Sequence, residues 1–170
     1  LVGTNNFAIN RDLKSIKGEL SNVTIEKIYS SDIEVASRQI ADKLAQDKQV
    51  DTVYIASKEA LVDVLSIASK AGKNRNPIIV SSNKSINQEL GSALNMNLSS
   101  NRIYGNDRIQ TNTKVIEKFY TKSFSPKVFI TRSNAPIDAI TVSAFAQKSD
   151  SPIVLASSSV SQYQRDVLYP

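Results

Sequence analysis

One sequence pattern occurs twice in this chain, and the second copy follows the first at an offset of 75 residues. The offset aligns Lys27–Asp32 with Arg102–Asp107, and it aligns Pro77–Val80 with Pro152–Leu155. The alignment continues from Lys27 to Ser82 without a gap, which is too long for a chance similarity. The sequence therefore predicts one structural unit that is built twice.

Each copy is predicted to hold an extended segment, a helix, a strand, a second helix and a closing strand. The extended segments are Thr24–Tyr29 and Asn101–Tyr104. Apolar residues in the first helix recur at spacings of three and four, so they share one face. These residues are Val35, Ile40, Ala41 and Leu44 in the first copy, and Val115, Ile116, Phe119 and Tyr120 in the second. The later elements are expected at Thr52–Ala56, Ala60–Ala71 and Pro77–Val80, and at Lys127–Thr131, Pro136–Gln147 and Pro152–Leu155.

Strands that are apolar throughout and alternate with helices are typical of a parallel sheet covered on both faces. We therefore expect an α/β fold of tandem, doubly wound parallel-sheet units with helices on both faces. Residues 24–100 hold one unit, and residues 101–170 hold a second that is incomplete at its C-terminal end. Residues 1–23 are interpreted as the tail of a preceding unit, with a strand end at Leu1–Gly3 and a helix at Asn6–Leu20. An apolar helix face that no neighbouring element covers predicts further repeat units or a partner chain.

The composition excludes most familiar enzyme chemistry. The chain has no cysteine and no histidine, so it lacks thiolates, the commonest general base and the commonest zinc ligands. Its five glycines are scattered and form no phosphate-binding loop. No local pair of carboxylates indicates a glycosidase. We therefore expect no catalytic residues, no metal site and no cofactor.

The charge favours an anionic partner. The formal net charge is +5, which suits nucleic acid, anionic lipid or an anionic wall polymer, although basic side chains also simply keep a domain soluble. They form no stripe with interleaved aromatic residues, so nucleic-acid binding is not expected. No apolar run approaches the roughly 20 residues of a membrane-spanning helix, so membrane insertion is not expected either. No signal peptide is visible at Leu1–Thr4.

The segment Arg102–Thr111 resembles the opening signature of the type 2 cell-wall-binding repeat of clostridial surface proteins, which reads roughly R-x-x-G-x-D-R-x-x-T. The first copy departs from it, with Ser30, Ile33 and Ala36 at the positions of Gly105, Arg108 and Thr111. Leu90–Asn101 is also too short for the strand and helix that usually close a unit. Later parts of the family repeat are similar to Ile137–Ala144, Pro152–Leu155, Val62–Ala68 and Pro77–Val80, and its closing strand and turn are similar to Leu1–Ile9.

The resemblance implies a binding function. Such repeats generally occur in threes, pack as a pseudo-threefold array, and hold S-layer and related proteins non-covalently to an anionic cell-wall polysaccharide. The implied protein is secreted and resides in the cell wall or S-layer. Its implied partners are that polysaccharide and either further repeat units or a partner chain of a surface layer. The alternative is a structural S-layer segment that makes mainly protein–protein contacts.

The expected polymer-binding residues begin with the signature itself. Arg102 and Arg108 offer guanidinium donors that suit phosphate or carboxylate groups, and Thr111 completes the signature. The alternative for Arg108 is an ion pair with Asp107 or another carboxylate, which would lock the turn. Gly105 is expected to supply a backbone conformation with positive φ.

Ligands collect beyond the carboxyl ends of strands in parallel α/β sheets, and this rule adds Ser82, Ser157 and Ser158 to the expected binding residues. Serines in that position are also routine turn formers. Stacking on sugar rings is an alternative for Tyr29 and Tyr104, but both end an apolar segment, so packing in the core or between units is expected.

The remaining motif residues are expected to be structural. Asp63 and Asp138 lie just inside helix starts, where a carboxylate contributes roughly 0.3–1 kcal/mol against the helix dipole. The alternative is a contact with a neighbouring unit or a ligand. Cap and first-turn residues before Asp138 are expected at Ser133, Asn134 and Pro136. Pro77 and Pro152 are expected to start strands, where a missing N–H does least harm.

Overall fold

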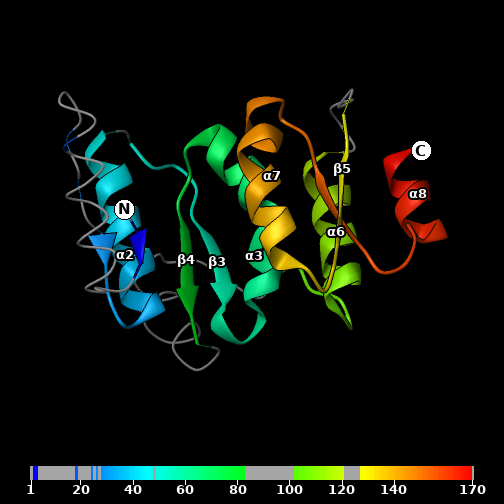
Figure 1. Ribbon diagram of the computed structural model, residues 1–170, viewed down its shortest axis with the longest axis horizontal. Helices are drawn as coiled ribbons and strands as arrows, with labels where there is room; N and C mark the ends of the chain where they lie inside the picture. Colours follow the sequence, from blue (N-terminus) through cyan, green and yellow to red (C-terminus); the bar gives the residue numbers. More distant parts are fainter. Residues whose placement is uncertain are drawn as a thin grey trace.

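The computed structural model describes residues 2–3, 18, 24, 26, 28–47, 49–82, 102–120 and 127–169. Most of the helix expected at Asn6–Leu20 and all of Leu90–Leu98 lie outside these residues, although Gly18 is helical. The described elements are shown in Figure 1. In chain order they are β1 (Val2–Gly3), β2 (Ile28–Tyr29), α2 (Ile33–Asp47), β3 (Tyr54–Ser57), the 3₁₀ turn η1 (Lys58–Ala60), α3 (Leu61–Asn74), β4 (Ile78–Ser81), α6 (Arg108–Phe119), β5 (Phe129–Arg132), α7 (Pro136–Lys148), β6 (Ile153–Ala156) and α8 (Gln162–Leu168).

The 75-residue offset of the sequence is also the offset of the structure. The pairs α2 and α6, β3 and β5, α3 and α7, and β4 and β6 each begin 75 residues apart. Even the left-handed residue after the second helix is repeated, because Arg75 has φ 54° and Asp150 has φ 47°. Each copy is thus a β–α–β unit, as the sequence predicts. Both second helices end slightly later than expected, at Asn74 and Lys148.

Each unit contains one parallel pair of strands. Tyr54 of β3 lies opposite Ile78 of β4, and Phe129 of β5 lies opposite Ile153 of β6. The backbone N–H of Tyr54 donates to the carbonyl of Pro77 at 3.0 Å, and that of Phe129 donates to Pro152 at 3.1 Å. Both prolines therefore precede a strand and use their carbonyl in the ladder, which confirms their expected role. The strand end expected at Leu1–Gly3 is also confirmed, because β1 pairs in parallel with β2.

The sheets are narrower than expected. In the part of the chain that is described, every sheet has two strands, and Arg102–Tyr104 is not a strand. Side-chain amides occupy the outer edge of β6 instead of a third strand. Asn112 donates from Nδ2 to the carbonyl of Ile153 at 2.8 Å, and its Oδ1 accepts from the N–H of Leu155 at 2.9 Å. Gln164 donates to the carbonyl of Leu155 at 2.9 Å. These bonds satisfy the buried edge without another strand.

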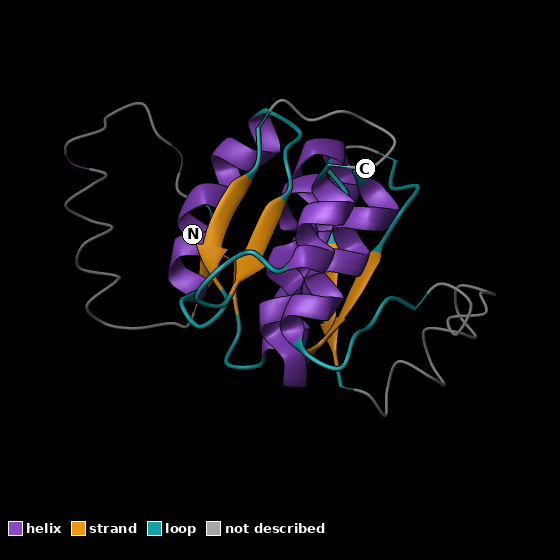
Figure 2. Ribbon diagram, turned by 90° about the vertical axis from the view of Figure 1, so that its right-hand side faces the viewer, coloured by secondary structure: helices purple, strands orange, loops and turns teal. Residues whose placement is uncertain are grey.

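The sheet of the second copy is covered on both faces, as expected, but one of the covering helices comes from the first copy. On one face, Leu65 of α3 joins a buried cluster with Ala139, Ala146, Ile153 and Leu155. On the other face, Ile116 and Tyr120 of α6 pack with Val154, and α8 adds Val167 and Leu168. Figure 2 shows the two strand pairs standing apart with helices between them. The second copy therefore completes its core with a helix of its neighbour.

The first helices of the two copies differ in how well their apolar faces are buried. Val115, Ile116 and Tyr120 of α6 are buried as predicted. In α2 the predicted face is only half-buried, and Val35 is exposed. The buried side chain of α2 is Ser37, whose Oγ accepts from the N–H of Val80 at 3.0 Å. Ser37 occupies the position that Asn112 has in the second copy, so one contact between helix and strand edge is made twice.

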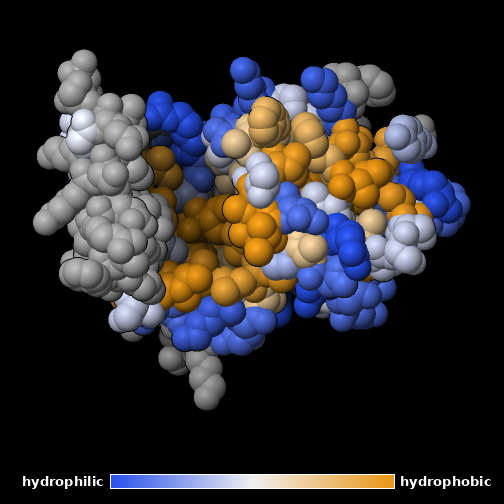
Figure 3. Space-filling view, viewed as in Figure 1, coloured by the Kyte–Doolittle hydropathy of each residue, from blue (hydrophilic) through white to orange (hydrophobic). Residues whose placement is uncertain are grey.

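Helix α7 carries large apolar side chains on its outer surface. Ile137 is 73% exposed, Ile140 is 58% exposed and Phe145 is 69% exposed. Figure 3 shows hydrophobic side chains gathered on the face of the molecule where α7 lies. Its opposite side buries Ala139 and Ala146 against the shared core. Both sides of this helix are thus apolar, a pattern typical of a helix that packs on two sides.

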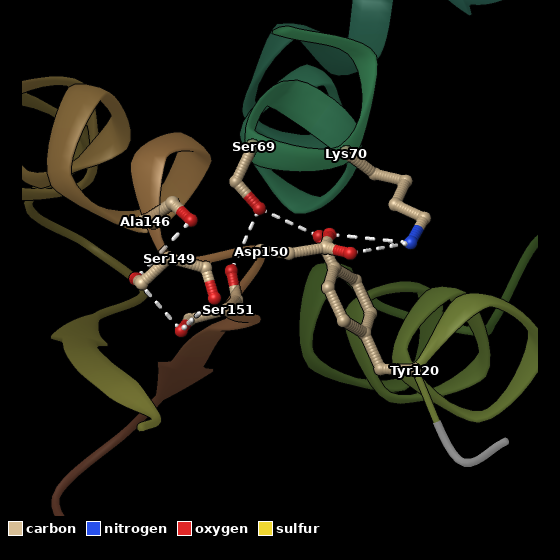
Figure 4. Close-up of polar contacts among 7 residues, drawn as sticks. All are labelled: Ser69, Lys70, Tyr120, Ala146, Ser149, Asp150 and Ser151. Carbon is tan, nitrogen blue, oxygen red and sulfur yellow. Dashed lines mark hydrogen bonds and ion pairs between the residues drawn. The ribbon is translucent and has the colours of Figure 1, made fainter. Parts of the chain in front are cut away.

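A polar cluster holds the two copies together at the C-terminal end of α3, and Figure 4 shows its arrangement. Ser69 Oγ donates to the carbonyl of Ser151 at 2.7 Å, and it lies 2.6 Å from the hydroxyl of Tyr120. Lys70 Nζ forms an ion pair with Asp150 at 3.1 Å and lies over the ring of Tyr120. Burial raises the pKa of Tyr120 to about 12. These bonds fix the orientation of the second copy relative to α3.

Candidate functional site

The loop 102–107 is held by hydrogen bonds to the first turn of α6. Asp107 is the N-cap of this helix, and its carboxylate accepts from the N–H of Gln110 at 2.8 Å. Gln110 in turn accepts from the N–H of Asn106 at 3.0 Å, and Thr111 Oγ1 accepts from the N–H of Gly105 at 2.9 Å. The side chains of the opening signature therefore build this loop, and Thr111 is buried while doing so.

Gly105 is needed for space and not for a left-handed backbone. Positive φ was expected there, but its backbone does not lie in that region, so this expectation is wrong. A Cβ atom at Gly105 would overlap Gln110 and lie 2.6 Å from the backbone nitrogen of Thr111. The loop packs directly on the start of α6, and only glycine leaves room for that contact.

Arg108 connects the start of α6 to the carboxyl end of the sheet. Its Nη1 donates to the carbonyl of Ser133 at 3.0 Å, and the N–H of Ser133 donates to the carbonyl of Ala156 at 2.7 Å. Ser133 follows β5 and Ala156 ends β6. Among the described residues, Arg108 forms no ion pair with Asp107 within 4.0 Å. The exposed guanidinium has five N–H donors, and the bond to Ser133 uses one of them.

Asp63, at the start of α3, places a carboxylate of the first copy within the electrostatic influence of Arg108. Its half-buried position raises the pKa of Asp63 above its ordinary value, because burial disfavours the charged form. The positive charge of Arg108 acts in the opposite direction and is the smaller effect. Asp63 and Asp138 both lie in the first turn of their helices, as predicted.

The caps of those two helices are not the expected ones. Pro136 is the first residue of α7, as predicted, but the N-cap is Ala135, and neither Ser133 nor Asn134 caps the helix. Ala60 is the N-cap of α3 and has no side-chain cap bond either. The first-turn aspartates are therefore the acidic groups at these helix starts, where they offset the partial positive charge of the helix end.

The predicted serines differ in exposure. Ser157 and Ser158 are exposed directly after β6, on the segment that continues from Ala156. Ser82 has the same position in the first copy and is half-buried after β4. The sequence interpretation missed Arg132, which ends β5 and is exposed at the same edge of the sheet. The rule about strand ends that selected the serines also applies to Arg132, but the strand was expected to end at Thr131.

Tyr104 is exposed instead of packed in a core. It is 61% exposed, so the expected packing in a core or between these two copies is wrong for this residue. The guanidinium of Arg102 lies 4.9 Å from the centroid of its ring, and Lys114 Nζ lies 5.5 Å from it. Lys114 Nζ also donates to the backbone carbonyl of Tyr104 at 2.9 Å. The strand that was expected to end at Tyr104 does not form, so the side chain has no sheet face on which to pack. The side chain of Tyr29 lies outside what the structure describes.

The chemistry available at this edge of the sheet is that of binding. The described residues contain no group of three or more Asp or Glu side chains that could hold a metal ion. No helix in the described ranges is both long enough and apolar enough to cross a lipid bilayer. The exposed groups at this edge are the guanidinium groups of Arg108 and Arg132 and the hydroxyls of Ser157 and Ser158, and the exposed guanidinium of Arg102 lies on the loop before α6. They offer hydrogen bonds to acidic and hydroxyl groups of a ligand.

Comparison with known proteins points to the same class of function. Residues 102–168 match the family Cell wall binding domain 2 (CWB2). The fold is similar to that of Cwp6 from Clostridium difficile, with a TM-score of 0.77 and 26% identity over 91% of this chain and 29% of that protein. It is also similar to Cwp8 from Clostridium difficile, with a TM-score of 0.72 and 24% identity over 91% of this chain and 31% of that protein. The chain thus spans about a third of the length of either protein. No curated protein sequence matches it.

Proposed function

We propose that the chain anchors a cell-wall-associated surface protein non-covalently to an anionic cell-wall polysaccharide. The match of residues 102–168 to the CWB2 family of cell wall binding domains supports this proposal. The domain is a binding module and is not catalytic by itself. The proposed protein is secreted.

The position of Arg108 is the observation that carries the proposal. Its guanidinium is exposed, is oriented by the carbonyl of Ser133, and lies beside the strand ends that lead into Ser157 and Ser158. A planar guanidinium forms paired hydrogen bonds with phosphate or carboxylate groups. Hydroxyl groups next to it suit the hydroxyls of a sugar chain. The net charge of +5 adds a long-range attraction for a polyanion.

The proposed contacts divide the predicted residues into two groups. Arg102, Arg108, Ser157 and Ser158 are exposed and are proposed to contact the polymer directly. Ser82 is proposed as the corresponding contact of the first copy. Thr111 is proposed to act indirectly, because its buried hydroxyl is engaged with Gly105 and holds the loop in shape. Gly105 and Asp107 support the same loop.

We also propose that the chain is part of a pseudo-threefold array. The tail of one unit would occupy residues 1–23, and further units would occupy residues 24–100 and 101–170. Val62 and Leu65 of α3 pack into the core of the second copy, whereas their counterparts Ile137 and Ile140 on α7 are exposed. A third unit related to the second copy as the second is to the first would bury this face. One repeated rotation then generates the whole array.

The test is retention of the 170-residue chain on purified cell wall, before and after chemical removal of its anionic polymer. Arg108→Gln is expected to lower retention roughly tenfold, because a charge-assisted hydrogen bond is lost. Added salt should weaken the binding of the unmodified chain, since exposed charges are screened. Arg38→Gln removes the same charge from an exposed position on α2 and is the matched control, which should bind normally.

Equal retention on native and stripped wall would overturn polymer binding. That outcome would favour the second candidate, a structural S-layer segment that makes mainly protein–protein contacts. The exposed apolar face of α7 is the observation that supports this alternative. Thermal unfolding of each variant shows whether a loss of retention comes from the site or from the fold.

A further inference from the structure

Arg102, Tyr104 and Lys114 form an exposed cluster in which two cations lie over one aromatic ring. The guanidinium of Arg102 is 4.9 Å from the ring centroid and Lys114 Nζ is 5.5 Å from it, distances at which a cation interacts with the π-system. More than half of the Tyr104 side chain remains open to solvent. We refer to these three residues as the Tyr104 platform.

The platform is built by the fold and is not a chance meeting of long side chains. Lys114 Nζ is anchored by its hydrogen bond to the carbonyl of Tyr104 at 2.9 Å. The loop below Tyr104 is fixed on α6 by the bonds to Thr111, Gln110 and Asp107. The ring therefore has a defined position relative to both cations.

The two cations of the platform are not neutralised within the described ranges. Neither Arg102 nor Lys114 forms an ion pair with a carboxylate there. Two positive charges held near one ring repel each other, and an anionic group placed between them would remove that repulsion. The platform thus favours a ligand that carries a negative charge next to an apolar surface.

The first copy has no equivalent platform in its sequence. Gln39 stands at the position of Lys114, and Lys27 stands at the position of Arg102. One of the two cations is therefore absent from that copy, and the other is not a guanidinium. The second copy alone combines a tyrosine with an arginine and a lysine.

We infer that the Tyr104 platform binds an anionic sugar residue. The apolar C–H face of a pyranose ring packs against the exposed part of the tyrosine ring that the two cations leave open, while Arg102 and Lys114 bind the carboxylate or phosphate substituent. This inference rests on the proposed wall-polymer function and adds a contact through Tyr104, on the loop before α6, and Lys114, on α6 itself. Single-stranded nucleic acid is less well suited, because it requires successive aromatic platforms and the loop offers one.

The test compares Tyr104→Ala and Tyr104→Phe in the wall-retention assay with the 170-residue chain. Tyr104→Ala is expected to reduce retention about tenfold, since ring stacking and the ordered cations are both lost. Tyr104→Phe keeps the ring and should bind within about twofold of the original chain. Lys114→Gln introduces the residue of the first copy, and it should weaken retention and reduce its salt sensitivity.

A second measurement separates this inference from the proposed function. NMR shifts of the unmodified chain are followed during titration with a hexuronic acid, a hexose phosphate and a neutral hexose. Shifts at Tyr104 and Lys114 with either acidic sugar and not with the neutral one support the platform, and the responding acid identifies the carboxylate or the phosphate as the ligand group. No shift with any sugar, or normal wall retention of a folded Tyr104→Ala chain, would overturn the inference and leave the role of Arg108 intact. Shifts at the platform together with equal retention on native and stripped wall would instead overturn the proposed polymer binding.

Discussion

Helices α3 and α7 have the same place in the two copies, yet the face of α3 that carries Leu65 is buried and the equivalent face of α7 is exposed. Leu65 of α3 is 9% exposed, whereas Ile140, 75 residues later, is 58% exposed. Lys70 of α3 pairs with Asp150 of the second copy, whereas its counterpart Phe145 is exposed. The local structure of a repeat is therefore set by its own sequence, and its burial is set by the unit that follows it.

The sheet edges of the two copies differ in a similar way. Ser37 makes one hydrogen bond to β4, with the N–H of Val80. Asn112, at the same position of the second copy, bonds both to β6 and to Ser66 of α3. The side chain of Asn112 is longer than that of Ser37, so it bonds to β6 and to α3 of the first copy at the same time. The side chain that satisfies the edge of β6 therefore also joins the two units.

The largest expected effect comes from truncating the shared helix face in each copy. Leu65→Ala should lower the free energy of unfolding by about 3 kcal/mol, because it leaves a cavity between α3 and the second copy. Ile140→Ala, at the equivalent position of α7, should cost less than about 1 kcal/mol because its side chain is largely exposed. Urea unfolding of both variants measures the difference.

Equal costs at the two positions would contradict the distinction between a buried and an exposed face. The same two substitutions also test the proposed array when they are introduced into a longer chain that carries a further unit. If that unit covers α7, Ile140→Ala should there approach the cost of Leu65→Ala. An unchanged small cost in the longer chain would argue against a third unit on this face.

Much of the fold could be predicted because it depends on local patterns. The repeat fixes the order of elements, β-branched runs mark the strands, and Pro77 and Pro152 mark their starts. The family resemblance of the second copy is confirmed over residues 102–168. The predictions that failed concern features that depend on contacts between residues far apart in the sequence. The width of the sheets could not be foreseen, since Asn112 and Gln164 act as edge partners only after α6 and α8 have packed on β6.

The candidate site was predicted in part for the same reason. The signature residues do build the loop that packs on α6, and the prediction that Arg108 and the serines contact polymer remains to be tested. The roles of Gly105 and Tyr104 were mistaken, because one depends on the close approach of the loop to α6 and the other on a strand that does not form. Arg132 was missed because the strand was expected to end one residue earlier, and Lys114 carries no signal of its own in the sequence, since only the packed structure places it over the ring of Tyr104.

The next largest effect is expected at the strand edge. Asn112→Ala should cost about 2 kcal/mol, because it leaves the buried carbonyl of Ile153 and the N–H of Leu155 without partners. Ser37→Ala removes one bond at the equivalent position of the first copy and should cost about 1 kcal/mol. Asn112→Ser introduces the first-copy residue and should fall between these values. Chemical unfolding of the three variants checks the order, and a loss at Ser37 as large as that at Asn112 would show that the additional bonds of Asn112 contribute nothing.

The smallest expected effect distinguishes the two first-turn aspartates. At neutral pH, Asp138→Asn should cost about 0.3–1 kcal/mol through the lost helix-dipole interaction. Asp63→Asn should cost less, because removal of the charge also relieves its unfavourable burial. Since burial raises the pKa of Asp63, the folded state binds its proton more tightly than the unfolded state does. The stability of the original chain relative to Asp63→Asn should therefore rise as the pH falls through this raised pKa to the ordinary value of aspartate. Urea unfolding across that range measures it, and a difference that stays constant or shrinks on acidification would mean that burial does not raise the pKa of Asp63.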